Sequence, residues 1–167
     1  NFIGRTTELR QLREWLVSGE TRIAALVGPG GVGKTRLASR AAEAMAGDSE
    51  GGAFFVPLED LPADADIAAR MARSLGITGG SGDAFAEVCA HLAQRKVLVV
   101  LDNCEHLIDE CAQIVERLLD DCPNLRILAT SREPLRVAGE LAWRVPSLTV
   151  PRAHAQPGEL LESPAVQ

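Results

Sequence analysis

The chain has 167 residues, of which 46% are hydrophobic and 24% are charged, and its formal net charge is −6. This length suits one α/β domain with its own core, and the acidic charge makes the chain as a whole a poor candidate for holding a polyanion such as DNA. No signal peptide opens the sequence and no apolar run approaches the roughly 20 residues of a membrane helix, so we expect a cytoplasmic domain without membrane contact.

Predicted helices and strands alternate along the chain. After an extended lead-in, a helix capped by Thr6 or Thr7 is expected to bury one face, formed by Leu9, Leu12, Leu16 and Val17. Short apolar runs predict strands over 22–27, 53–58, 97–101 and 125–129, with a weaker one over 141–145. Helices are predicted over 36–45, 64–75, 83–94 and 105–119. The alternation indicates parallel βαβ units, hence an α/β three-layer sandwich around a mostly parallel five-stranded sheet.

A glycine-rich segment lies between the first predicted strand and the helix that follows it. It fits the Walker A pattern G-x-x-x-x-G-K-T, in which glycines let backbone N–H groups surround phosphate oxygens while the start of the helix faces the same anion. We expect Lys34 to reach the β- and γ-phosphates and the Thr35 hydroxyl to bind Mg²⁺. The residues predicted to hold the nucleotide are Gly28, Pro29, Gly30, Gly31, Val32, Gly33, Lys34, Thr35 and Arg36. An ordinary glycine-rich turn is the weaker interpretation, because strand, loop, lysine, threonine and helix occur in the required order.

The apolar run 97–101 ends at Asp102, as a Walker B strand does. Parallel sheets bind ligands at the carboxyl ends of their strands, so Asp102 is predicted to hold Mg²⁺ there. The next position, where many P-loop ATPases carry a catalytic carboxylate, is Asn103, which can orient a water but cannot take its proton. The next acid is Glu105. It is either the base for hydrolysis or only a favourable charge at the start of the following helix, and both interpretations stay open.

Arg132 follows the fourth predicted strand at the same edge of the sheet. It could sense the γ-phosphate through a charge-assisted hydrogen bond and so distinguish ATP from ADP; the alternative is a surface salt bridge. The candidate catalytic residues are Lys34, Asp102, Glu105 and Arg132. The chain contains no Asn-Lys-x-Asp motif for reading guanine, which favours an adenine nucleotide.

The cysteines are Cys89, Cys104, Cys111 and Cys122. They form no C-x-x-C pair and no Cys/His cluster typical of zinc. We expect buried, reduced thiols, because an unpaired cysteine is among the most buried residue types.

Four segments together resemble the STAND/NB-ARC class of signal-transduction ATPases. They are Phe2-Ile3-Gly4-Arg5 with Glu8, the segment 27–38, Leu101-Asp102-Asn103-Cys104-Glu105-His106-Leu107 and Ala129-Thr130-Ser131-Arg132-Glu133-Pro134-Leu135. The last two resemble bacterial transcriptional regulators of the SARP and LuxR types in particular. The resemblance runs from Phe2 to about Pro151. It implies that Ile3, Gly4 and Arg5 lie near the adenine and ribose, and that Arg132 is the γ-phosphate sensor.

The resemblance also implies a domain organisation. We expect residues 1–150 to form the nucleotide-binding domain and residues 151–167 to be a linker toward a helical and winged-helix region, followed by sensor repeats. DNA binding would belong to a separate domain, in agreement with the acidic charge of this one. The expected partners are an adenine nucleotide and those other domains of the same polypeptide, with oligomerisation in the ATP-bound state.

The leading functional hypothesis is a switch that ADP holds closed and ATP opens, with slow or conditional ATP hydrolysis. One alternative is a stand-alone P-loop ATPase or a small-molecule kinase, although no arginine-rich lid segment can be named. Another is an interaction module that binds nucleotide only for stability. Lys34, Thr35, Asp102 and Arg132 argue against that module, because a scaffold has no need of a γ-phosphate sensor.

Overall fold

The computed structural model describes residues 5–18, 21–46, 51–78 and 82–146. Within these ranges helices and strands alternate as the sequence predicts. In chain order they are α1 (Thr6–Ser18), β1 (Ile23–Val27), α2 (Lys34–Met45), β2 (Ala53–Pro57), α3 (Ile67–Ser74), α4 (Ala84–Leu92), β3 (Val97–Asp102), the 3₁₀ turn η1 (Cys104–His106), α5 (Ile108–Asp121), β4 (Leu125–Ser131) and β5 (Leu141–Arg144). None of the described helices combines the length and apolar character required to cross a bilayer.

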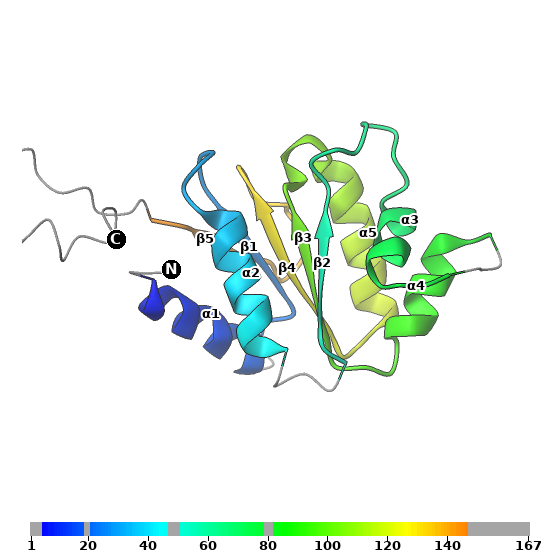
Figure 1. Cartoon of the computed structure of the whole chain (residues 1–167), viewed down its shortest axis with the longest axis horizontal. Helices are drawn as coiled ribbons and strands as arrows, with labels where there is room; N and C mark the ends of the chain where they lie inside the picture. Colours follow the sequence, from blue (N-terminus) through cyan, green and yellow to red (C-terminus); the bar gives the residue numbers. More distant parts are fainter. Residues whose placement is uncertain (1–4, 19–20, 47–50, 79–81, 147–167) are drawn as a thin grey trace, which may run out of the picture.

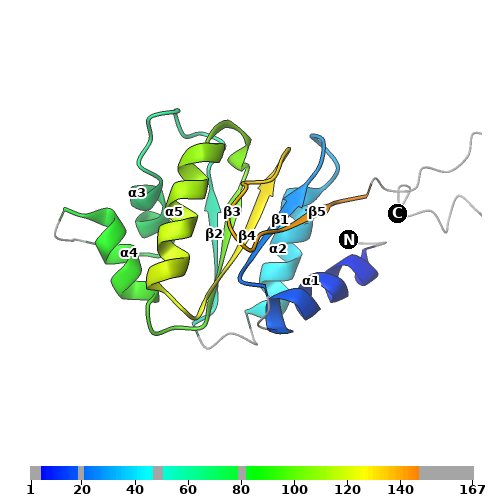
Figure 2. The same cartoon turned by 180° about the vertical axis from the view of Figure 1, so that it is seen from behind.

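The five strands form one sheet in the order β2-β3-β4-β1-β5, and every neighbouring pair is parallel. Helices α1 and α2 cover one face, and α3, α4 and α5 cover the other (Figures 1 and 2). The prediction of a three-layer α/β sandwich is therefore confirmed. Because all strands run the same way, the segments that follow β1, β3 and β4 meet at one edge of the sheet.

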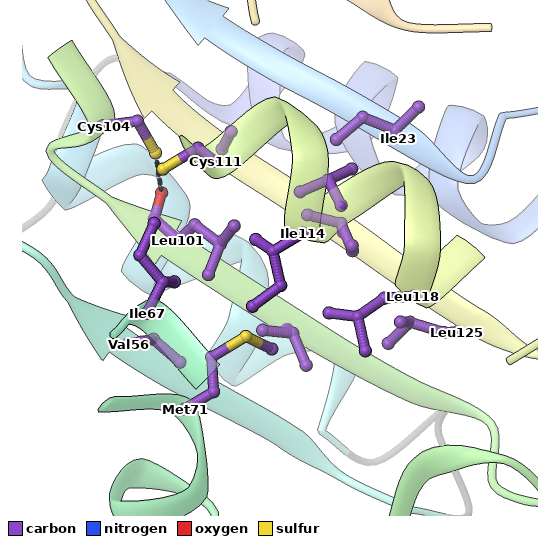
Figure 3. Packing of buried hydrophobic residues seen from close by; sticks show 14 of the residues in the cluster. Ile23, Val56, Ile67, Met71, Leu101, Cys104, Cys111, Ile114, Leu118 and Leu125 are labelled. Carbon is purple, nitrogen blue, oxygen red and sulfur yellow. Dashed lines mark hydrogen bonds between the residues drawn. The ribbon is translucent and has the colours of Figure 1, made fainter. Parts of the chain in front are cut away.

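Each face of the sheet has its own hydrophobic core. Alternate residues of a strand point to opposite faces, so in β3 Val99 packs toward α3 and α5 while Val100 packs toward α2. The α5 side is rich in large aliphatic groups, including Ile114, Leu118 and Met71 (Figure 3). All six residues of β3 are buried, which explains why its sequence is continuously apolar up to Asp102.

Several predicted boundaries and contacts were wrong. The helix expected to start at Glu105 is interrupted: η1 ends at His106 and α5 begins at Ile108. The helix expected over 64–75 begins at Ile67, because the Asp66 carboxylate caps it by accepting from the Ala69 N–H. Strand β4 continues to Ser131, so Thr130 lies in the sheet rather than after it.

The predicted buried face of α1 is also narrower than expected. Leu12 and Leu16 are fully buried, but the side chain of Val17 is 52% exposed. Each helical residue turns the chain by about 100°, so Val17 lies on the solvent side when Leu16 faces the sheet.

Candidate functional site

The connection from β1 to α2 is set by its own glycines. Gly31 and Gly33 have φ angles of 78° and 92°, a left-handed conformation that residues with a Cβ rarely adopt. Gly33 is the N-terminal cap of α2, and no side chain caps this helix. The first N–H groups of α2 are thus not taken by a side-chain acceptor, and the end of a helix in this condition attracts an anion.

Lys34 is held against the loop that precedes it. Its Nζ donates to the carbonyl oxygens of Gly28 (2.9 Å) and Pro29 (3.1 Å), and the residue is only 7% exposed. The loop is tied to the sheet where the Gly28 N–H donates to the Ser131 carbonyl at the end of β4. The ammonium group is therefore positioned at the loop by two backbone carbonyl oxygens.

Arg5 lies behind the same loop. It is 3% exposed, and its Nη2 donates to the carbonyl oxygens of Val32 (2.8 Å) and Pro146 (3.0 Å). The guanidinium thus joins the loop to the segment that follows β5. The predicted contact of Arg5 with adenine and ribose stays a prediction, and Ile3 and Gly4 lie outside the described residues.

Asp102 is locked by a hydroxyl group from the neighbouring strand. Its Oδ1 accepts a 2.6 Å hydrogen bond from the Thr130 hydroxyl, whose oxygen accepts in turn from the Asn103 N–H at 2.9 Å. Asp102 is 6% exposed and Thr130 is fully buried. Asn103 has a φ of 69°, and this left-handed residue turns the chain out of β3 into η1. The motif around Thr130 was visible in the sequence, but this partnership was not predicted.

Glu105 and Arg132 form an ion pair at the edge of the sheet. The Arg132 Nε donates to Glu105 Oε1 at 3.2 Å, and the two side chains are 68% and 19% exposed respectively. The other carboxylate oxygen of Glu105 is buried without a hydrogen-bond partner. Glu105 lies in η1, and the first turn of α5 carries its own acids, Asp109 and Glu110. The two roles predicted for Glu105 stay predictions; in the structure its ion-pair partner is Arg132.

One cavity of about 680 Å³ lies between the glycine-rich loop, Glu105 and Arg132. That volume lies within the range of small-molecule sites, about 300–1,000 Å³. The residues that line the cavity are Gly30, Gly31, Gly33, Lys34, Thr35, Arg36, Ser39, Arg40, Phe55, Asn103, Glu105 and Arg132. The sequence analysis did not predict Ser39, Arg40 or Phe55 in this lining. Ser39 and Arg40 lie one turn beyond Thr35 and Arg36 on the same face of α2, and this helical spacing could have predicted them.

The lining of this cavity is positively charged. Among the described residues it carries Lys34, Arg36, Arg40 and Arg132 against one carboxylate, that of Glu105, in a chain whose net charge is −6. Thr35 is exposed and lines the cavity, whereas Asp102 is buried and does not line it. The predicted role of both residues toward Mg²⁺ stays a prediction.

The cysteines stand apart from this chemistry. All four are free, and Cys104, Cys111 and Cys122 are buried, whereas Cys89 is only partly so. A hydrogen bond with Cys111 and burial raise the pKa of Cys104 well above its usual value, and burial raises the pKa of Cys89 to about 12. Thiolates are the reactive form, so these raised pKa values disfavour a nucleophilic role for Cys104 and Cys89. The Cys104 Sγ donates a hydrogen bond to the Leu101 carbonyl (Figure 3).

Comparison with known proteins identifies the family of the chain. A family model described as "AAA domain" matches residues 17–137. The chain is 45% identical over 132 residues to Rv0890c of Mycobacterium tuberculosis, which is named as a candidate HTH-type transcriptional regulator, and 38% identical over 151 residues to the uncharacterized protein Rv0894 of that organism. These matches cover 78% and 90% of this chain but only 15% and 38% of the two relatives. The chain thus corresponds to a small part of each relative.

Solved structures share the fold at low sequence identity. A signal transduction ATPase with numerous domains (STAND) and a tetratricopeptide repeat sensor, PH0952 from Pyrococcus horikoshii, superposes with a TM-score of 0.56 at 18% identity. That match covers 89% of this chain and 24% of the other. PCH-2 from C. elegans superposes with a TM-score of 0.53 at 16% identity, covering 87% of this chain and 45% of PCH-2. At such identities the likeness establishes the fold alone.

Proposed function

The chain belongs to the AAA-domain family of P-loop ATPases, and on that basis we propose that it is the ATP/ADP-binding switch domain of a multidomain regulator. The observation that carries the proposal is the cavity at the carboxyl edge of the sheet, where Lys34, Thr35 and Arg132 converge. A glycine-rich loop, a lysine and an arginine that converge in this way are suited to distinguishing a triphosphate from a diphosphate.

In this proposal each residue has a defined task. The loop and the start of α2 hold the phosphates, and Lys34 exchanges the Gly28 and Pro29 carbonyls for phosphate oxygens. Thr35 and Asp102 hold Mg²⁺, which neutralises phosphate charge when bound. Asp102 keeps its geometry through Thr130. Arg132 donates to the γ-phosphate, which only ATP possesses.

Hydrolysis is expected to be slow or conditional. Asn103, directly after Asp102, cannot accept a proton from a water. Among the described residues, the one carboxylate that lines the cavity belongs to Glu105. Its Oε1 already accepts a hydrogen bond from the Arg132 Nε and is thus not free to orient an attacking water, so this arrangement favours retention of the nucleotide over rapid turnover.

We further propose the setting of this domain. Residues 1–150 would form the nucleotide-binding unit, with 151–167 leading toward helical, winged-helix and sensor domains of a bacterial regulator of the SARP or LuxR type. The setting is supported by Rv0890c, a candidate HTH-type transcriptional regulator, and by PH0952, a signal transduction ATPase with numerous domains. DNA contact would belong to those other domains, and oligomerisation would follow ATP binding.

The test is to measure ATP and ADP affinity and steady-state hydrolysis by the purified chain with excess Mg²⁺, using the Lys34→Ala variant as the blank. An unassisted switch NTPase turns over on the order of 10⁻⁴ to 10⁻³ per second, whereas typical enzymes reach about 10 per second. Tight binding with a rate near the lower value supports the switch. A rate near the higher value indicates a stand-alone ATPase, and undetectable binding by the unaltered chain would reject the proposal.

A further inference from the structure

We infer that Glu105 is the positioning residue for Arg132: it holds the guanidinium by its Nε edge, so that the outer nitrogens face the phosphate loop and favour ATP over ADP. This inference rests on the proposed function, because it concerns how the same cavity distinguishes the two nucleotides. It assigns Glu105 to nucleotide discrimination, in place of the two roles that the sequence left open.

The contact geometry shows which part of Arg132 is held and which part is offered. Glu105 Oε1 accepts from Nε at 3.2 Å, at the inner edge of the guanidinium. The outer nitrogen Nη2 faces the loop: a Cβ added to Gly30 would lie 3.8 Å from it. An arginine held at Nε keeps its Nη groups available for an oxyanion, so the ion pair and a phosphate contact are compatible.

Glu105 is the fixed member of the pair. It lies on η1, where the Leu107 N–H donates to the Cys104 carbonyl at 2.9 Å and a His106 ring nitrogen lies 3.1 Å from the Leu61 carbonyl oxygen. Its side chain is 19% exposed, against 68% for Arg132. A long, exposed arginine loses rotamer freedom when it binds, and a rigid carboxylate at its Nε removes part of that loss in advance.

Glu105 has no other strong partner to explain its position. Its Oε2 is buried and accepts no hydrogen bond from the described residues. An oxygen left in this condition is unfavourable. The pairing through Oε1 to Arg132 is the one interaction in the described structure that the carboxylate makes.

If Glu105 positions Arg132, loss of its carboxylate should weaken ATP binding; if Glu105 competes with phosphate for Arg132, the same loss should strengthen it. Removing the carboxylate in Glu105→Ala should weaken ATP binding about two- to fivefold, as expected for the loss of an exposed ion pair, and leave ADP binding unchanged. Glu105→Gln keeps an oxygen acceptor for Nε and should restore most of the ATP preference. Arg132→Ala should weaken ATP binding about tenfold, again sparing ADP.

The experiment is a double-mutant cycle measured by calorimetric titration of ATP and ADP with Mg²⁺. The urea unfolding transition of each variant verifies its folding, and Glu105→Ala should have no further effect on the ATP-to-ADP affinity ratio in the Arg132→Ala background. Tighter ATP binding by Glu105→Ala would overturn the inference, because Glu105 would then compete with phosphate for Arg132. Loss of hydrolysis in Glu105→Gln with an unchanged affinity ratio in every Glu105 variant would also overturn it and make Glu105 the base.

Failure of the inference can be told from failure of the proposed function. If the unaltered chain binds ATP, hydrolyses it slowly and loses the binding in Lys34→Ala, the switch proposal stands whatever the Glu105 variants do. An equal affinity ratio in the unaltered chain, Glu105→Ala and Arg132→Ala would then overturn the inference alone. If the unaltered chain binds neither nucleotide, both proposals fall together.

Discussion

Two strand-to-helix connections meet at the cavity, and they are built in opposite ways. After β1 the chain passes through a glycine-rich loop and enters α2 directly at Lys34, with the turn made by the left-handed Gly33. After β3 the chain turns at Asn103, passes through η1 and reaches α5 only at Ile108. The first connection is shaped by its own backbone, whereas the second is held by groups from elsewhere in the fold.

The charged side chains follow the same division. Lys34 bonds to carbonyl groups five and six positions away, within its own loop. Asp102 and Glu105 are held by Thr130 and Arg132, which lie 28 and 27 positions away on or beside β4. The comparison teaches that the lysine of the phosphate-holding half is held within its own loop, although Arg5 and Ser131 join that loop to the rest of the fold. We call this the local half, and we call the half expected to sense phosphate the long-range half, because its side chains are held only once β3 and β4 are paired.

The largest effect is expected at the local half. Lys34→Ala should lower ATP affinity at least about 100-fold, because charge-assisted contacts to more than one phosphate oxygen are lost. Lys96→Ala is the matched control: it removes the other lysine of the chain, which is exposed ahead of β3. Equal affinities of both variants in a fluorescent-ATP titration would contradict the assignment of the loop.

The next effect tests the long-range half. Thr130→Val should lower the free energy of unfolding by about 1–3 kcal/mol, because the buried Asp102 carboxylate and the Asn103 N–H both lose their partner. Thr130→Ser retains the hydroxyl and should recover most of that loss. Urea unfolding of the three proteins measures the difference. A Val variant as stable as the parent would show that the two hydrogen bonds of the Thr130 hydroxyl do not stabilise the fold.

A smaller effect tests the backbone of the loop. Gly33→Ala places a Cβ at a φ of 92° and should cost about 1–2 kcal/mol in unfolding free energy. Gly30→Ala is the control, because Gly30 does not have a positive φ and its added Cβ would meet only Arg132 Nη2 at 3.8 Å, an ordinary contact. The local interpretation of this connection fails if the two alanine variants unfold at the same denaturant concentration.

The smallest effect concerns the connection after β2, which lies outside both halves. Arg70 donates to both carboxylate oxygens of Asp60 (2.8 and 2.7 Å), and this hydrogen bonding lowers the pKa of Asp60. A lowered folded-state pKa stabilises the fold above the unfolded value of about 3.9, and that contribution disappears as the pH falls through the folded pKa.

Asp60→Asn should therefore lower the thermal midpoint slightly at neutral pH and converge with the parent in acid. Asp64→Asn removes the same charge from the same exposed connection without that ion pair. A pH-independent difference for Asp60→Asn, or the same pH profile for both variants, would show that the Arg70 contact does not stabilise the fold.

The sequence determined the order of helices and strands, the parallel sheet and the phosphate loop. It could do so because strand burial, helix periodicity and the conformational freedom of glycine act over a few neighbouring residues. The identification of Asp102 was similarly local, since it depended on the apolar run that precedes it. The roles of these residues toward a nucleotide remain proposals for the experiments above.

Only the tertiary structure decided what surrounds those local features. It showed that Asp102 is paired with Thr130, that Arg5 joins the loop to Pro146, and that Glu105 forms an ion pair with Arg132. Each of these contacts joins residues at least 27 positions apart. They depend on strand order and on where the chain turns after β3, which sequence patterns of short range do not encode.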